Sequence, residues 1–90
     1  MSESRRPRLS TGIRLQRDRP TQRWMLVGPE RGLWLSETAH AALTLCDGTR
    51  TEDEIVSALT ARFEASKVRV QGDIARLFQD LRARCLLENA

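Results

Sequence analysis

Few residues of the types that carry catalysis or bind metal ions occur in this chain of 90 residues. His40 is the single histidine, and Cys46 and Cys85 are the two cysteines. These three residues lack the short Cys-x-x-Cys or His-x-x-x-His spacing that zinc sites use. We therefore expect two free, buried thiols, a histidine that serves packing or the helix surface, and no metal ion or other cofactor.

The acidic run at residues 52–54 offers neighbouring carboxylates, but consecutive residues of a helix point in different directions. Thr51 and Glu54 fit instead the capping box with which a helix begins. No spacing of glycines matches a phosphate-binding loop. Since no nucleophile–base pair, metal site or phosphate loop can be assembled, the sequence predicts a protein that is not an enzyme and that acts by binding.

The elements that would position a binding surface begin with a small sheet. Short apolar runs, separated by turn-forming prolines and glycines, predict three antiparallel strands at residues 13–17, 23–28 and 31–35. Each of the two outer strands would leave one backbone edge unpaired. Residues 1–12 show no periodicity and are rich in arginine, so we expect a flexible basic tail there.

Three helices are predicted after the strands. Ser36 can cap the first helix, Gly48 can adopt a left-handed conformation at the corner, and the second helix runs from about 52 to 63. The third helix is defined by apolar residues at helical spacing, namely Val70, Ile74, Leu77, Phe78, Leu81 and Cys85. The predicted class is α+β: residues 13–90 form a single winged helix-turn-helix-like domain, with three short antiparallel strands followed by three helices.

The charge of the chain is distributed unevenly. An apolar fraction of 40% and a charged fraction of 30% fit a folded protein. The net charge of +3 divides into +5 for residues 1–35, with eight arginines against three acids, and −2 for residues 36–90, with seven bases against nine acids. A basic stripe of this kind suits nucleic acid or an acidic peptide, and charge alone does not choose between them. No apolar run approaches the roughly 20 residues of a membrane span, so we expect a soluble, cytoplasmic protein.

One part of the sequence resembles a known family. The segment LWLSETAHAALTLCDGTRTEDEIVSAL, followed by Asp73-Ile74, Phe78, Leu81 and Leu86-Leu87, is similar to the pyrroloquinoline quinone (PQQ) biosynthesis protein D family, PqqD. The resemblance covers about residues 13–88 and is most specific at LCDGTRT, the acidic helix start and Ile55. The family usually has glycine where this chain has Cys85, so the resemblance does not fix the residue at which the third helix ends.

The resemblance implies a function and a set of partners. Members of the family resemble winged helix-turn-helix domains and act as peptide chaperones, or RiPP recognition elements, which bind the precursor peptide PqqA and present it to the radical-SAM enzyme PqqE. Strand addition would pair the peptide with the free edge of the third strand and lay it against the third helix. The expected peptide-binding residues are Arg31, Gly32, Leu33, Trp34 and Leu35 at the edge, and Arg69, Val70, Ile74, Leu77 and Phe78 on the helix.

Two alternatives stand beside the peptide chaperone. A winged-helix DNA-binding regulator would place the third helix in the major groove, but Asp73 and Asp80 between its arginines oppose attraction to phosphates. A purely structural adaptor would lack the peptide groove. We therefore expect no nucleic-acid partner, and we predict a weak homodimer through the unpaired strand edge, or a swapped one through exchange at Ser36 or Gly48.

Overall fold

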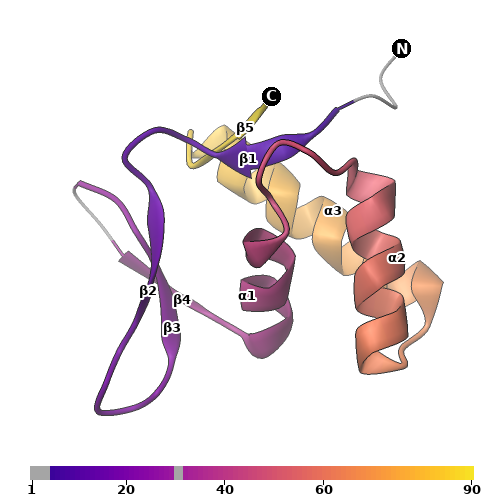
Figure 1. Cartoon of the computed structure of the whole chain (residues 1–90), viewed down its shortest axis with the longest axis horizontal. Helices are drawn as coiled ribbons and strands as arrows, with labels where there is room; N and C mark the ends of the chain where they lie inside the picture. The colour runs from indigo at the N-terminus through magenta and orange to yellow at the C-terminus, as the bar shows by residue number, and fades with distance from the viewer. Residues whose placement is uncertain (1–4, 30–31) are drawn as a thin grey trace.

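The computed structural model describes residues 5–29 and 32–90, with a short helix, α1, between a small sheet and two longer helices (Figure 1). The elements in chain order are β1 (Pro7–Leu9), β2 (Arg14–Arg17), β3 (Trp24–Val27), β4 (Gly32–Leu35), α1 (Glu37–Thr44), α2 (Glu52–Phe63), α3 (Lys67–Ala83) and β5 (Leu87–Asn89). The sheet of β2, β3 and β4 lies on one side of α1, and α2 and α3 lie on the other side. β1 and β5 form a second, two-stranded sheet.

The three-stranded sheet has the order β2-β3-β4, so β4 is an edge strand. Its register places Leu15, Leu26 and Leu33 side by side, and Leu26 is only 2% exposed. Because residues opposite each other in a sheet share one face, this row lies on the core side. The predicted strands are confirmed to within a residue at their described ends, while the predicted start at Arg31 lies outside the described residues.

The helices begin where side chains cap them. Ser36 caps α1, because its Oγ accepts the N–H of Ala39 at 3.1 Å. The predicted bounds of α2, residues 52–63, are confirmed. Helix α3 begins at Lys67, earlier than its apolar pattern indicated, because Ser66 supplies a cap before the first buried residue.

A flexible tail was predicted for residues 1–12, and this prediction is wrong for residues 7–9, which form β1. Residues 7–9 pair antiparallel with β5 and bring the two ends of the described chain together. The N–H of Gly48 donates to the carbonyl of Pro7 at 3.0 Å, and the N–H of Ala90 donates to the carbonyl of Arg6 at 2.8 Å. These partners are distant in sequence, so no local periodicity marks the strand. The α+β class with three helices is confirmed, but strands at both ends extend the predicted order.

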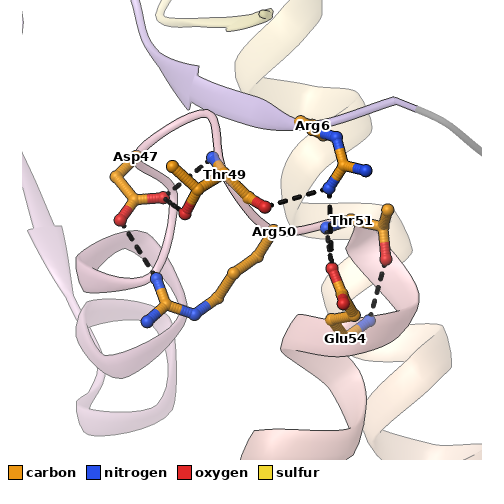
Figure 2. A network of polar contacts seen from close by, with 6 residues as sticks. All are labelled: Arg6, Asp47, Thr49, Arg50, Thr51 and Glu54. Atoms are coloured by element: carbon orange, nitrogen blue, oxygen red, sulfur yellow. Dashed lines mark hydrogen bonds and ion pairs between the residues drawn. The ribbon is translucent and has the colours of Figure 1, made fainter.

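Polar contacts hold the corner between α1 and α2 (Figure 2). Asp47 accepts hydrogen bonds from both the N–H and the hydroxyl of Thr49. The predicted capping box follows: the N–H of Thr51 donates to Oε1 of Glu54 at 2.7 Å, and the N–H of Glu54 donates to Oγ1 of Thr51 at 3.2 Å. Arg6, just before β1, donates to the carbonyl of Thr49 and lies 3.8 Å from the Glu54 carboxylate. The corner therefore joins both helices to the N-terminal strand.

Apolar side chains from the sheet, the three helices and β5 form one core. Its buried members are Leu26, Ala41, Ala42, Leu43, Cys46, Ile55, Val56, Leu59, Val70, Ile74, Phe78, Leu81, Leu86 and Leu87. Cys46 is a free, buried thiol as predicted, and burial raises its pKa to about 12, so it stays protonated at neutral pH. Cys85 is also free but exposed, so the prediction of burial is wrong there.

Cys85 is exposed because α3 ends before it, in a Schellman turn. The N–H of Leu86 donates to the carbonyl of Leu81 at 2.9 Å, and the N–H of Cys85 donates to the carbonyl of Arg82 at 3.0 Å. Cys85 itself has a φ of 62°, the left-handed conformation that glycine adopts without strain. The backbone thus keeps the conformation that suits glycine at this position, although the residue here is cysteine.

We expect Cys85→Gly to raise the free energy of unfolding by about 1 kcal/mol, because glycine relieves the left-handed strain at a smaller cost in chain entropy. Urea denaturation followed by circular dichroism measures the change. Cys85→Ala is the matched control, since it removes the thiol but keeps the Cβ atom, and it should leave the midpoint nearly unchanged. Equal shifts in both variants would assign the effect to the thiol instead of the backbone.

Candidate functional site

Strand β4 offers a free backbone edge. It pairs with β3 on one side, and among the described residues no strand pairs with its other side. Leu33 and Leu35 are half-buried, whereas Trp34 on the opposite face is 48% exposed. The guanidinium of Arg23 lies 4.4 Å from the centroid of the Trp34 ring. The unpaired N–H and C=O groups of such an edge can hydrogen-bond to another extended chain.

A groove between α1 and α3 begins where β4 ends. Two hollows of about 280 and 190 Å³ share Thr38 and Asp73, and the larger one is bordered by Ser36, which directly follows β4. We call this surface the α1–α3 groove; it is lined by Ser36, Thr38, Ala39, Phe63, Ala65, Arg69, Val70, Asp73, Ile74 and Leu77. Val70 and Ile74 are buried beneath it, while Arg69 and Asp73 are exposed at its rim. The groove therefore combines an apolar floor with a charged rim.

Most of the predicted contact residues lie in one of these two places. Gly32, Leu33, Trp34 and Leu35 form β4, and Arg69, Val70, Ile74 and Leu77 line the groove. Phe78 does not line it, because its side chain is 0% exposed and belongs to the core. Adjacent helix positions point about 100° apart, so Leu77 reaches the groove while Phe78 lies beneath it. Arg31 lies outside the described residues.

Six residues that line the groove were not among the predicted contacts, namely Ser36, Thr38, Ala39, Phe63, Ala65 and Asp73. Thr38 and Ala39 belong to the first turn of α1, and Asp73 lies on α3 beside Ile74. Thr38 and Ala39 face the groove because of how α1 is rotated about its axis relative to α3, and the sequence of α1 alone does not predict that rotation. Asp73 did have a signal, because the motif that resembles the PqqD family includes it.

His40 stacks on a tryptophan from the sheet. The ring centroids of His40 and Trp24 are 4.0 Å apart, with an angle of 12° between the ring planes. Burial lowers the pKa of His40, and the positive charges of Arg62 and Arg17 lower it further. The imidazole is therefore uncharged at neutral pH and packs as an aromatic ring, as the sequence suggested.

The described part of the chain shows neither a metal cage nor a membrane span. Across residues 5–29 and 32–90, no three or more histidine, cysteine, aspartate or glutamate side chains are grouped as metal ligands. In the same ranges, no helix has the length and apolar character needed to cross a membrane. What the edge and groove offer to a ligand is backbone hydrogen bonding, apolar contact and charge at the rim.

A free strand edge beside an apolar groove is the arrangement with which small domains bind peptides by strand addition. The comparison with known families makes the assignment specific. The chain belongs to the PqqD family, described as coenzyme PQQ synthesis protein D, whose family model matches residues 23–87. The matched range contains β3, β4, all three helices and both sides of the groove.

Named relatives and solved structures agree with this assignment. A PqqA binding protein of Rhodopseudomonas palustris (strain TIE-1) is 38% identical over 90 residues, covering 100% of this chain and 88% of the relative. A second match is the solution NMR structure of the PqqD truncation of Methylobacterium extorquens PqqCD, which is described as a functional and stand-alone RiPP recognition element. It matches with a TM-score of 0.79 and 33% identity, and the match covers 91% of this chain and 87% of that chain. The crystal structure of PqqD from Xanthomonas campestris matches with a TM-score of 0.58 and 34% identity, covering 87% of this chain and 88% of that chain.

The lowered pKa of His40 makes stability depend on pH. In the unfolded chain the imidazole of His40 has its ordinary pKa, so it binds a proton more readily than in the folded protein. The stability that neutral His40 contributes is therefore present above about pH 6.5, and it is lost as the pH falls through the folded-state pKa. We expect the urea midpoint of the wild type to fall more between pH 7.5 and pH 5.5 than that of His40→Gln. The carboxylates titrate alike in both proteins and cancel in the comparison. Parallel pH profiles would show that His40 titrates normally in the fold.

Proposed function

We propose that this chain is a peptide chaperone of PQQ biosynthesis that binds the precursor peptide PqqA by strand addition. The observation that carries the proposal is the free edge of β4 next to the α1–α3 groove. Its support from comparison is membership of the PqqD family and a relative named for PqqA binding. In this arrangement the peptide forms an additional strand beside Gly32–Leu35, and its backbone supplies much of the affinity.

Selection among peptides then depends on side chains. In an added strand, alternate side chains point to opposite faces, so every second residue of the peptide faces the core side of the sheet. On that side the α1–α3 groove offers Leu77 and the edges of Val70 and Ile74 for apolar contact. Arg69 and Asp73 at the rim are placed to orient polar groups of the peptide. We therefore propose these residues, together with β4, as the peptide-binding site.

We propose that the chain contributes binding and no chemical step. Pairing with β4 would hold a short, unstructured peptide in an extended form, which lowers the entropy that the modifying enzyme must otherwise overcome. The partner that receives the peptide in this proposal is the radical-SAM enzyme PqqE. The proposed location is the cytoplasm, where the free thiols Cys46 and Cys85 would remain reduced.

We propose that the three helices and the sheet form a winged helix-turn-helix-like fold. Other proteins use such a fold to bind DNA, so DNA binding is the alternative function. Its DNA-binding use is disfavoured by the exposed face of α3, where Asp73 and Asp80 alternate with Arg69 and Arg76. Carboxylates on a recognition helix repel the phosphates that dominate DNA affinity. The structure thus favours a sheet edge, and not α3 in a major groove, as the ligand surface.

Amide hydrogen exchange tests strand addition directly. Saturating PqqA is expected to slow the exchange of alternate amides in residues 32–35 by roughly tenfold or more, because a new strand hydrogen-bonds to them. Strand β2, residues 14–17, is the matched internal control, since it is the other edge of the same sheet. Protection of β2 without β4 would place the peptide on the opposite edge, and protection of neither would remove strand addition. Double-stranded DNA, tested alongside, should protect neither edge.

The free edge also predicts a weak homodimer that competes with PqqA. Unpaired edges invite pairing with a second copy, and connections at Ser36 or Gly48 would permit exchange of halves in a swapped form. We expect light scattering to give a mass that falls toward 10.3 kDa on dilution or on addition of PqqA. A dimer that survives both dilution and saturating peptide would show that the copies associate through another surface.

A further inference from the structure

A further hollow, separate from the two that form the groove, lies at the end of the sheet, on the other side of the first turn of α1 from the groove. Its volume is about 430 Å³, and it is lined by Gln22, Arg23, Trp24, Leu35, Ser36, Glu37, His40 and Arg62. We call it the Arg62 pocket. Ser36 borders both this pocket and the α1–α3 groove, and Leu35 is the last residue of β4. A peptide paired with β4 would therefore leave the strand at the mouth of this pocket.

Positive charge dominates around the Arg62 pocket. Arg23 and Arg62 line it, Arg17 lies close enough to act on His40, and Glu37 is the one acid in the lining. Among the described residues, none of these three arginines has a carboxylate within ion-pair distance.

The arginines are instead held against aromatic rings. The guanidinium of Arg62 lies 5.3 Å from the centroid of Phe63, and that of Arg17 lies 5.8 Å from the centroid of Trp24. A guanidinium that lies over an aromatic ring keeps N–H groups with which it can bind a planar anion.

The stacked rings of Trp24 and His40 also line the pocket, and His40 is affected by the positive charge of two of these arginines. His40 lies on Trp24, and its pKa is lowered by burial first and then by Arg62 and Arg17. The charges that act on the imidazole come from β2 (Arg17) and α2 (Arg62), and Glu37 of α1 lines the same pocket. Arg23 precedes β3, and its guanidinium lies over Trp34 on the opposite face of the sheet. The arginines thus raise the local potential, and an anion placed among them would be favoured.

We infer that the Arg62 pocket binds the carboxylate of an aspartate or glutamate side chain of the peptide, just outside the segment that pairs with β4. The inference rests on the proposed function. Arg62 supplies a guanidinium edge that can bind a carboxylate with two N–H groups. Because β4 runs toward the pocket, an antiparallel peptide places the acidic residue before its paired segment, and a parallel peptide places it after.

Calorimetry with synthetic PqqA tests the site. Arg62→Gln is expected to raise the Kd about tenfold or more, since a charge-assisted bidentate contact is lost. Arg76→Gln is the matched control, because Arg76 is exposed on α3 outside both the pocket and the groove, and it should change the Kd less than about twofold. Equal effects of the two substitutions would overturn the inference and leave only a general charge effect.

A set of peptide variants identifies the carboxylate. Each acidic residue of PqqA is replaced by its amide, and a further peptide carries a C-terminal amide. For one side-chain variant the difference between wild type and Arg62→Gln should disappear, as a double-mutant cycle requires. If the difference persists for every side-chain variant, or disappears only with the C-terminal amide, the inferred side-chain site is wrong. Absence of any PqqA binding by the wild type would instead refute the proposed function itself.

His40 provides a readout that does not depend on affinity. A carboxylate in the pocket favours the imidazolium, so the proton NMR titration of His40 should move to higher pH when PqqA is bound. With the amide peptide identified above, this displacement should be lost although binding through β4 continues. An unchanged titration in the wild-type complex would show that no carboxylate enters the pocket.

Discussion

The close approach of Gly48 to β1 and to Ala90, which follows β5, is the constraint that orders the other elements. Its N–H donates to the carbonyl of Pro7 at 3.0 Å, and its φ of 84° lies in the region that favours glycine. A Cβ atom at this position would lie only 3.1 Å from the Cβ of Ala90. Since β1 pairs with β5, and β5 follows α3, the corner sets where α3 lies. The groove thus depends on residues of the corner, none of which lines it.

Features specified by neighbouring residues could be predicted from the sequence. The bounds of α2 follow from the capping box of Thr51 and Glu54, in which both partners lie within one turn. The free edge of β4 follows from the hairpin pattern, because two successive hairpins give the order β2-β3-β4, in which the last strand is an edge. β1 and β5 escaped prediction because each is stabilised mainly by the other, at the far end of the chain.

The site was predictable to the extent that it coincides with periodic elements. The apolar stripe of α3 identified the groove floor at Val70 and Ile74, but the stripe is wider than the groove and also includes Phe78, which is entirely core. No pattern in the sequence predicts the Arg62 pocket, because the residues that line it come from the sheet, α1 and α2 and are irregularly spaced along the chain. Side chains that meet only through tertiary packing leave no spacing rule in the sequence.

The pairing of β1 with β5 has a consequence for how this domain can be joined to other proteins. Pro7 lies opposite Asn89, and neighbouring strands are about 5 Å apart, so the two connections of the domain leave from one place. A host protein could accept the whole domain in a single surface loop without being stretched. The free edge of β4 belongs to the other sheet, so neither insertion nor end-to-end fusion would occupy it.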